Sequence, residues 1–148
     1  RREVELGLSD GINVEIKAET LRSDGIEAKV AEAIRRHGLA ESILVSSFNP
    51  LTLRRFRHVM PEVAIGFLHS AESPFFLPHL MSGLSHEARN PHYTLIDAKY
   101  MAWAKRVGYR VNTWTVNDPA KAVDLFALGV DCIITDVPDV IRAALQTA

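Results

Sequence analysis

Short β-rich runs alternate with amphipathic helical segments along most of the chain, and this alternation limits the possible fold more than any other feature of the sequence. Strands are predicted over residues 12–17, 43–46, 63–68, 110–116 and 131–135. Helices are predicted over residues 26–37, 50–60, 95–107, 119–128 and 138–145. Strands that alternate with helices form a parallel sheet through right-handed crossovers, so the pattern indicates an α/β barrel or an open doubly wound sheet.

The composition limits the class of protein. The 148 residues are 47% hydrophobic, so we predict a single domain over residues 1–148 with one core and an irregular excursion at about 70–92. The 17 Lys and Arg nearly balance the 18 Asp and Glu, which argues against a nucleic-acid partner because such a protein would show a basic face. No apolar run approaches the roughly 18 residues of a membrane helix and no signal peptide is visible. We therefore expect no transmembrane segment and a cytoplasmic location.

The first predicted strand, residues 12–17, alternates apolar and polar side chains as Ile-Asn-Val-Glu-Ile-Lys. Its apolar face suits packing beneath helices, which leaves Asn13, Glu15 and Lys17 on the other face. Parallel α/β folds carry their chemistry at the carboxyl ends of strands, where Glu15 and Lys17 lie. A carboxylate suits a divalent cation and an ammonium suits a phosphate oxygen, and about 7 Å separates residues two apart on a strand. A structural or solvated Glu15–Lys17 pair fits the spacing equally well.

Four motifs occur in an order and spacing typical of a known family. They are Asn-Val-Glu-Ile-Lys at 13–17, Val-Ser-Ser-Phe-Asn at 45–49, Trp-Thr-Val-Asn at 114–117 and Gly-Val-Asp-Cys-Ile-Ile-Thr-Asp-Val-Pro at 129–138. In these motifs the chain resembles glycerophosphodiester phosphodiesterases, over nearly its whole length and least clearly between residues 70 and 90. The resemblance implies the C-terminal five βα units, strands four to eight, of a (β/α)8 TIM barrel of the PLC-like phosphodiesterase type, incomplete as given.

The resemblance also implies an activity, the metal-dependent hydrolysis of a glycerophosphodiester to an alcohol and glycerol 3-phosphate. The implied cofactor is a divalent cation, Mg²⁺ or Ca²⁺, and the implied partner is the small-molecule glycerophosphodiester. By resemblance, Glu15 is a metal ligand, Lys17 contacts phosphate and Trp114 is an apolar wall at the pocket mouth. Phe48 is a second candidate for that wall. His92 lies in the long excursion, which is placed to fold over the mouth, and is a further candidate for contact with substrate.

Several residues also have a structural interpretation. Trp114 shares a strand face with Asn112 and Val116, so it equally suits a position that fills the barrel end. His69 lies just past a strand end and is a weaker candidate for contact with substrate. Cys132 lies in an apolar run and is expected to be a small buried core residue.

The motifs that would complete the family pattern are absent. Family members begin with a strand that ends in His-Arg-Gly, and a Glu-x-Asp pair and a His-Asp motif follow, but neither His-Arg-Gly nor His-Asp occurs here. We therefore expect the two acid/base histidines in about 100 preceding residues, judged against the roughly 250 typical of the fold. The chain starts at Arg1 rather than Met and reads as part of a longer protein, inactive in isolation. The alternative function is a non-catalytic half-barrel that binds a partner or forms homo-oligomers through its open edges.

Overall fold

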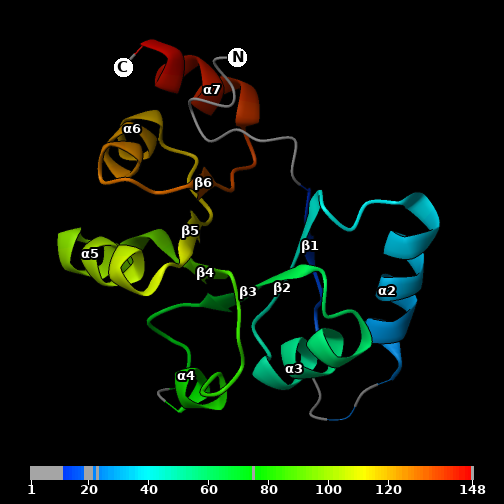
Figure 1. Cartoon of the computed structure of the whole chain (residues 1–148). Helices are drawn as coiled ribbons and strands as arrows, with labels where there is room; N and C mark the ends of the chain where they lie inside the picture. The colour runs from blue at the N-terminus through cyan, green and yellow to red at the C-terminus, as the bar shows by residue number, and fades with distance from the viewer. Residues whose placement is uncertain (1–11, 19–21, 23, 75, 148) are drawn as a thin grey trace. The chain divides into compact units, whose positions relative to one another are not determined.

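The computed structural model describes residues 12–18, 22, 24–74 and 76–147. The elements, labelled as in Figure 1, are β1 (Ile12–Glu15), α2 (Ile26–His37), β2 (Ile43–Ser47), α3 (Pro50–Val59), β3 (Ala64–His69), α4 (Leu77–Leu80), β4 (Ala88–Pro91), the 3-10 helix η1 (Tyr93–Leu95), α5 (Ala98–Val107), β5 (Arg110–Thr113), α6 (Pro119–Ala127), β6 (Cys132–Ile133) and α7 (Pro138–Thr147). The described residues fall into two compact units. We call residues 12–68 and 72–88 the N-terminal unit, and residues 69–71 and 89–147 the C-terminal unit. The single domain over residues 1–148 stays a prediction.

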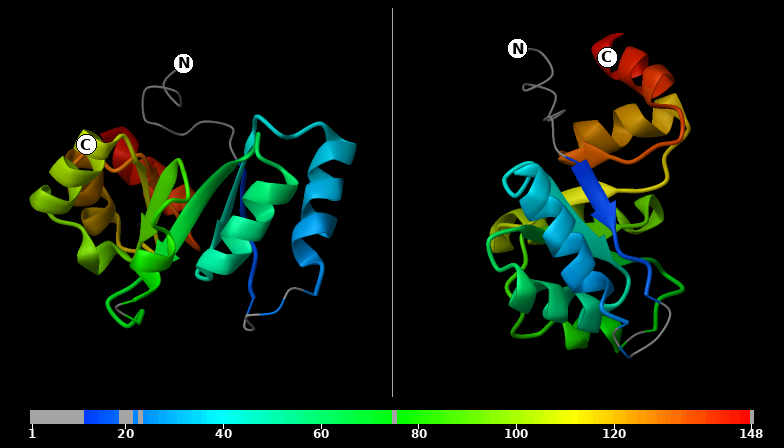
Figure 2. Two further views of the ribbon diagram at one scale, coloured as in Figure 1. Left: turned by 60° about the horizontal axis from the view of Figure 1, so that its bottom comes forward. Right: turned by 90° about the vertical axis from the view of Figure 1, so that its right-hand side faces the viewer.

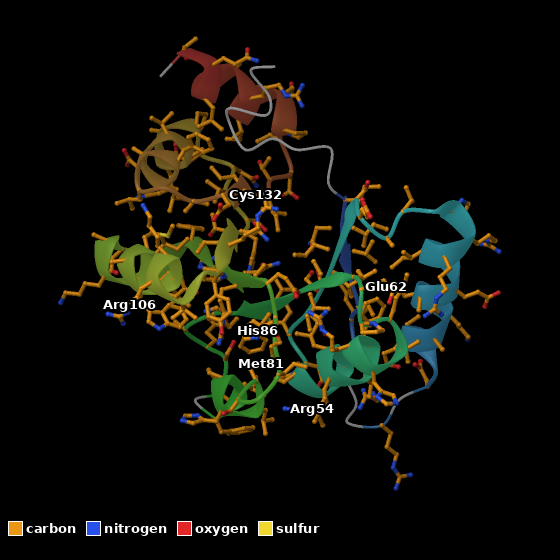
Figure 3. All side chains as sticks on the ribbon, in the orientation of Figure 1. Arg54, Glu62, Met81, His86, Arg106 and Cys132 are labelled. Atoms are coloured by element: carbon orange, nitrogen blue, oxygen red, sulfur yellow. The ribbon has the colours of Figure 1, made fainter. Side chains whose placement is uncertain are left out.

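The N-terminal unit is a parallel arrangement of β1, β2 and β3 with helices packed on one face. Glu15 lies in register with Ser46, and Ser46 lies in register with Gly66. Helices α2 and α3 lie side by side against the strands (Figure 2). Fully buried side chains from α3 and β3, Phe56 and Phe67, belong to the core between the two layers. Met81, after α4, belongs to the same core (Figure 3). Apolar burial of this kind is the main favourable term in folding.

Local signals in the sequence account for the helix ends of this unit. Helix α2 ends at Gly38, whose φ of 66° is in the left-handed region that glycine adopts without a steric penalty. Helix α3 begins after Asn49, whose side chain accepts a hydrogen bond from the backbone N–H of Leu51 at 3.0 Å. Pro50 occupies the first turn, where its missing N–H has no helical partner to lose. These predicted boundaries are confirmed.

The C-terminal unit has a second core of its own. Strands β5 and β6 are parallel, with Asn112 in register with Cys132 and Thr113 in register with Ile133. Val111 from β5 packs with side chains of α5, α6 and α7. Cys132 lies in β6 and is partly buried rather than fully buried (Figure 3). Burial raises the pKa of the Cys132 thiol, which Asp131 reinforces and Arg110 opposes.

The structure differs from the sequence-based prediction in the excursion at about residues 70–92. The prediction of irregular structure over about 70–92 is wrong at Ala88–Pro91, which forms β4, so the described residues contain six strands where five were predicted. Asn90 and Pro91 are poor strand formers, so residue propensity does not predict a strand here. Helix α5 begins at Ala98 rather than at 95, because Asp97 is its N-cap and accepts from the backbone N–H of Tyr100 at 2.7 Å. No described helix has the length and apolar character needed to cross a membrane.

Candidate functional site

Glu15 is at the carboxyl end of β1, on the strand face that points away from the helices. Val14 and Ile16 pack into the core, whereas Asn13, Glu15 and Lys17 are exposed, as the alternation predicts. The register places Glu15, Ser46 and Gly66 in one row across β1, β2 and β3. Because neighbouring strands are about 4.8 Å apart, this row sets the Glu15 carboxylate beside the Ser46 hydroxyl, and Ser46 in turn beside Gly66, which has no side chain.

Lys17 follows β1 and is exposed. In the part of the chain that the structure describes, Glu15 and Lys17 do not form an ion pair with one another. A direct Glu15–Lys17 ion pair is therefore not formed, and both side chains are exposed, which a solvated role also fits. A role for either residue stays a prediction.

Two serines after one another on β2 have different surroundings. Ser47 Oγ donates to the Ile16 carbonyl at 2.7 Å and accepts from the Asn49 backbone N–H at 3.1 Å, so it ties the ends of β1 and β2 to the start of α3. Ser46 Oγ is buried and has no hydrogen-bond partner among the described residues. A buried hydroxyl without a partner costs about 1–3 kcal/mol. Phe48, the next residue but one, is 39% exposed and presents an apolar side chain beyond the strand end.

The donor set of this row fits part of a divalent-cation site. A carboxylate and a hydroxyl are oxygen ligands of the kind that Mg²⁺ and Ca²⁺ prefer, and the unpartnered Ser46 Oγ lies next to Glu15 in register. However, nowhere in the described residues do three or more His, Cys, Asp or Glu side chains come together as a metal-binding group. The chain therefore offers some of the ligands that such a cation needs, and the others would have to come from elsewhere.

Trp114 and His92 lie together in the C-terminal unit. They form an isolated parallel bridge, and their rings meet edge to face with centroids 5.0 Å apart. The Trp114 indole N–H donates to the Asn90 carbonyl at 2.8 Å, so the ring is held by the backbone and this N–H does not point to a ligand. The His92 ring shares a 2.8 Å hydrogen bond between Nδ1 and Thr94 Oγ1. Trp114 thus has the fixed orientation that a wall requires.

His69 ends β3 and contacts an aromatic cluster. Its Nε2 lies 3.3 Å from the hydroxyl oxygen of Tyr100. The Tyr100 and Trp103 rings are 5.4 Å apart, and the guanidinium of Arg89 lies 5.1 Å from the centroid of Tyr109. Burial is the main reason that the pKa of Tyr100 is raised, reinforced by Tyr109 and opposed by Arg89. Contact of His69 with substrate stays a prediction.

The loops that follow β5 and β6 are joined by a reciprocal set of hydrogen bonds. Asn117 Nδ2 donates to Asp136 Oδ2 at 2.9 Å, and Asn117 Oδ1 accepts from the backbone N–H of Asp136 and from Thr135 Oγ1, both at 3.0 Å. Next to this set lies a cavity of about 260 Å³, lined by Tyr93, Thr115, Val116, Asn117, Asp118 and Lys121. Asp118 caps α6 by accepting from Ala120 N–H at 2.9 Å. Sequence reasoning assigned no binding role here.

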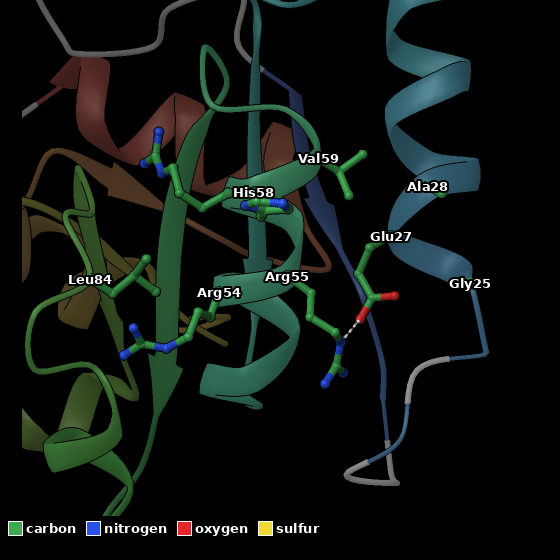
Figure 4. Close-up of a pocket in the computed structure, with 9 residues that line it drawn as sticks. Gly25, Glu27, Ala28, Arg54, Arg55, His58, Val59 and Leu84 are labelled. Carbon is green, nitrogen blue, oxygen red and sulfur yellow. Dashed lines mark hydrogen bonds and ion pairs between the residues drawn. The ribbon is translucent and has the colours of Figure 1, made fainter.

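A larger hollow of about 620 Å³ lies in the N-terminal unit against α2 and α3 (Figure 4). None of the predicted site residues lines it. Arg54 and Arg55 extend in different directions, and each already has partners: Arg54 donates to the carbonyls of Leu80 and Ser82, and Arg55 Nε donates to Glu27 Oε1 at 2.6 Å. The charges are used within the fold, so this hollow does not resemble an anion site.

Solved structures share the fold of this chain, and a family model matches most of its length. The crystal structure of a protein from Silicibacter pomeroyi DSS-3 superposes with a TM-score of 0.83 at 23% identity, over 97% of this chain and 55% of that one. A glycerophosphodiester phosphodiesterase from Parabacteroides distasonis superposes with a TM-score of 0.74 at 25% identity, over 93% and 58%. The predicted fold class, an incomplete (β/α)8 barrel of this phosphodiesterase type, is confirmed. Residues 1–140 match the model of the glycerophosphoryl diester phosphodiesterase family, and the chain belongs to that family.

The relatives are longer than this chain. A glycerophosphodiester phosphodiesterase from Caldanaerobacter subterraneus is 31% identical over 130 residues, which are 86% of this chain and 52% of the relative. A glycerophosphodiester phosphodiesterase from Bacillus altitudinis is 30% identical over 135 residues, 86% of this chain and 53% of the relative. An Oleispira antarctica phosphodiesterase, whose structure holds the product sn-glycerol-3-phosphate, superposes with a TM-score of 0.71 at 27% identity, over 92% of this chain and 55% of that one. The chain thus spans about half the length of the curated relatives it matches.

Sequence reasoning missed two polar residues on the strand faces that carry the predicted site. Ser46 is half of a Ser-Ser pair, and the alternation that placed Glu15 would have placed it on the same face, had the register been known. Asn90 is hidden in the excursion, where Asn-Pro is typical of a turn. Both are fully buried and carry a side-chain atom with no partner among the described residues.

Proposed function

We propose that residues 1–148 supply part of a site that hydrolyses glycerophosphodiesters to an alcohol and glycerol 3-phosphate. The observation that supports it best is the row of Glu15, Ser46 and Gly66 across three parallel strands, with Glu15 at the carboxyl end of β1, in a chain of this phosphodiesterase family. The relative from Oleispira antarctica, bound to sn-glycerol-3-phosphate, supports the choice of substrate class. We also propose a cytoplasmic location, which fractionation of the source cells would test.

The reaction transfers the phosphoryl group to water. A bond forms between phosphorus and the water oxygen, the bond between phosphorus and the alcohol oxygen breaks, and that oxygen takes up a proton. A bound Mg²⁺ or Ca²⁺ would neutralise charge on the phosphoryl oxygens. Glu15 would hold the cation with its carboxylate, and Lys17 would bind a phosphoryl oxygen with its ammonium. The proton transfers belong to histidines that we expect outside residues 1–148.

Three of the predicted residues would contribute contacts rather than chemistry. The Trp114 indole is held by the backbone and packs against the His92 ring, and an indole is suited to the carbon atoms of a substrate. Phe48 is exposed at a strand end and would serve as a further apolar contact. In this proposal, these three residues determine how tightly the diester binds and do not move protons.

The test uses the complete reading frame that encodes this chain, with glycerophosphocholine as substrate and Mg²⁺ or Ca²⁺ added. We expect hydrolysis that chelation abolishes, and a loss of about 100-fold or more in kcat for Glu15→Gln, the scale of losing one electrostatic contact in a transition state. Glu32→Gln on the exposed surface of α2 is the matched control and should retain activity. Wild-type activity of Glu15→Gln would exclude the proposed role of this carboxylate.

The second candidate is a non-catalytic module. It is favoured by the lack of a cluster of three potential metal-binding side chains within the residues described. Under this alternative, the complete protein binds neither Mg²⁺ nor glycerol 3-phosphate in calorimetric titration, and the chain forms homo-oligomers or captures a partner. Saturable binding of glycerol 3-phosphate that requires Lys17 would exclude it.

A further inference from the structure

Asn112 and Thr113 of β5, together with Trp114 just after the strand, donate side-chain hydrogen bonds to β4. Asn112 Nδ2 donates to Asn90 Oδ1 at 3.2 Å, and Thr113 Oγ1 donates to the Pro91 carbonyl at 3.0 Å. Trp114 Nε1 donates to the Asn90 carbonyl at 2.8 Å. We call these five residues the β4–β5 seam. All of them belong to the C-terminal unit, and the seam is therefore described within one compact body.

The seam lies beside a proline in β4. Pro91 has no backbone N–H, so β4 lacks a backbone donor at this position, and the three side-chain bonds all use oxygens of β4 as acceptors. Asn112 and Trp114 lie on the strand face opposite Val111, which packs into the helical core. On that face a barrel normally carries bulky apolar side chains, yet here it carries a pair of asparagines. Asn90 is 0% exposed and Asn112 is 9% exposed, so the amides are removed from solvent.

This arrangement has a stability cost that packing does not explain. Asn90 Nδ2 is buried and has no hydrogen-bond partner among the described residues. An unsatisfied buried donor is unfavourable, whereas two apolar groups of the same shape would pack there without that penalty. The pair does, however, fix Asn90 from both of its oxygens: the side-chain oxygen is held by Asn112, and the backbone oxygen holds the indole of Trp114.

We propose that Asn112 and Asn90 are positioning residues that set the orientation of the Trp114 indole and thereby the affinity for substrate. Neither residue takes part in the chemical step. The inference rests on the proposed function, because it assumes that Trp114 contacts the diester. Loss of the Asn112 side chain removes the partner of Asn90 Oδ1, so the neighbouring backbone oxygen of Asn90 holds the indole less firmly, while the reacting groups are unaffected.

The kinetic test uses the complete protein with glycerophosphocholine. We expect Asn112→Leu to raise KM about fivefold with kcat within about twofold, because one hydrogen bond is worth about 1 kcal/mol and 1.4 kcal/mol is tenfold. Val123→Ala in α6 is the matched control, since it removes apolar packing from the same core without touching the seam. It should leave KM unchanged.

A second measurement does not depend on activity. Residues 1–148 contain two tryptophans, Trp103 and Trp114, so the complete protein is prepared with Trp103→Phe and with phenylalanine at any tryptophan outside residues 1–148, which leaves Trp114 as the fluorophore. In this background we expect Asn112→Leu to increase acrylamide quenching of Trp114 fluorescence and to shift its emission to longer wavelength. The double variant Asn90→Leu/Asn112→Leu replaces both amides, so it leaves neither side chain with an unsatisfied buried polar group. It should therefore fold and still show the higher KM and quenching.

The outcomes separate the two proposals. If Trp114→Ala leaves KM unchanged, Trp114 does not contact the diester and the proposed function of this residue fails. If Trp114→Ala raises KM while Asn112→Leu and the double variant change neither KM nor quenching, only the positioning role is overturned. A fall in kcat at constant KM for Asn112→Leu would also overturn it, because that pattern belongs to the chemical step.

Discussion

Tyr100 shows at the scale of one residue how burial determines a chemical property. The folded chain favours the neutral phenol, so the pKa of Tyr100 lies above its ordinary value of 10.0. The unfolded chain releases this proton near the ordinary value of about 10. Above that pH the unfolded state therefore holds fewer protons than the folded state, and deprotonation favours unfolding.

We predict that the stability of the protein falls as pH rises above about 10, and that Tyr100→Phe removes part of this dependence. Urea midpoints measured at pH 8, 10 and 11 would test it. The difference in absorbance at alkaline pH between wild type and Tyr100→Phe isolates the titration of this phenol. A Tyr100 midpoint at or below its ordinary value would contradict the burial seen here.

Arg55 and Glu27 form an ion pair between α3 and α2 (Figure 4). The Glu27 side chain is 4% exposed and the Arg55 side chain is 30% exposed, so loss of the arginine leaves the more deeply buried charge without its main partner. We predict that Arg55→Ala lowers the free energy of unfolding by about 3 kcal/mol, and Glu27→Gln by about 1 kcal/mol.

Urea unfolding of both variants tests the ion-pair prediction. Arg36→Ala, on the exposed side of α2, is the control and should change stability by less than about 0.5 kcal/mol. Equal losses for Arg55→Ala and Arg36→Ala would mean that the pair contributes nothing beyond an exposed contact.

At the scale of the element, the start of α3 depends on a single side chain. Asn49 caps the helix, and its own N–H donates to Ser47 Oγ at 3.1 Å, which links the cap to the end of β2. We predict that Asn49→Ala lowers the free energy of unfolding by about 1 kcal/mol, while Asn49→Asp stays within a few tenths because aspartate also caps. Chemical denaturation with far-UV circular dichroism would measure both. A neutral alanine variant would mean that the cap is dispensable.

Elements with local signals were the ones that the sequence could predict. Helices α2 and α3 each have an apolar stripe and a glycine or asparagine at one end, and α3 also has a proline in its first turn, all within or next to the segment itself. Strand β4 has no such signal, because Asn90 and Pro91 are held by donors from β5, more than 20 residues away in the chain. Its strand state is a property of tertiary contacts, which residue propensity does not encode.

The candidate site also combines residues that local patterns predict with residues that depend on contacts between distant segments. Alternation along one strand was enough to place Glu15 and Lys17 on a face. The position of Ser46 beside Glu15 depends on the register between two strands, which no single segment determines. Trp114 was expected either to line the pocket mouth or to fill the barrel end, and its role stays a prediction. The hydrogen bond from its indole N–H to the backbone of β4 joins residues 24 positions apart, so no local pattern indicates it.

At the scale of the whole molecule, the chain spans about half the length of the curated relatives it matches. We predict that purified residues 1–148 show no detectable hydrolysis of glycerophosphocholine and bind Mg²⁺ only weakly, because the described oxygen ligands are too few for a cation that needs about six. Phosphate release and calorimetry would test this. Metal-dependent turnover by the isolated chain, free of contaminating enzyme, would contradict the prediction.

The β4–β5 seam also determines how the chain avoids a folding error. Backbone hydrogen bonds alone distinguish poorly between neighbouring registers. Here Asn112, Thr113 and Trp114 each donate to a particular oxygen of β4, and a slip by one residue would turn all three side chains to the opposite faces and lose the three bonds together. The seam therefore favours this register over one shifted by a single residue.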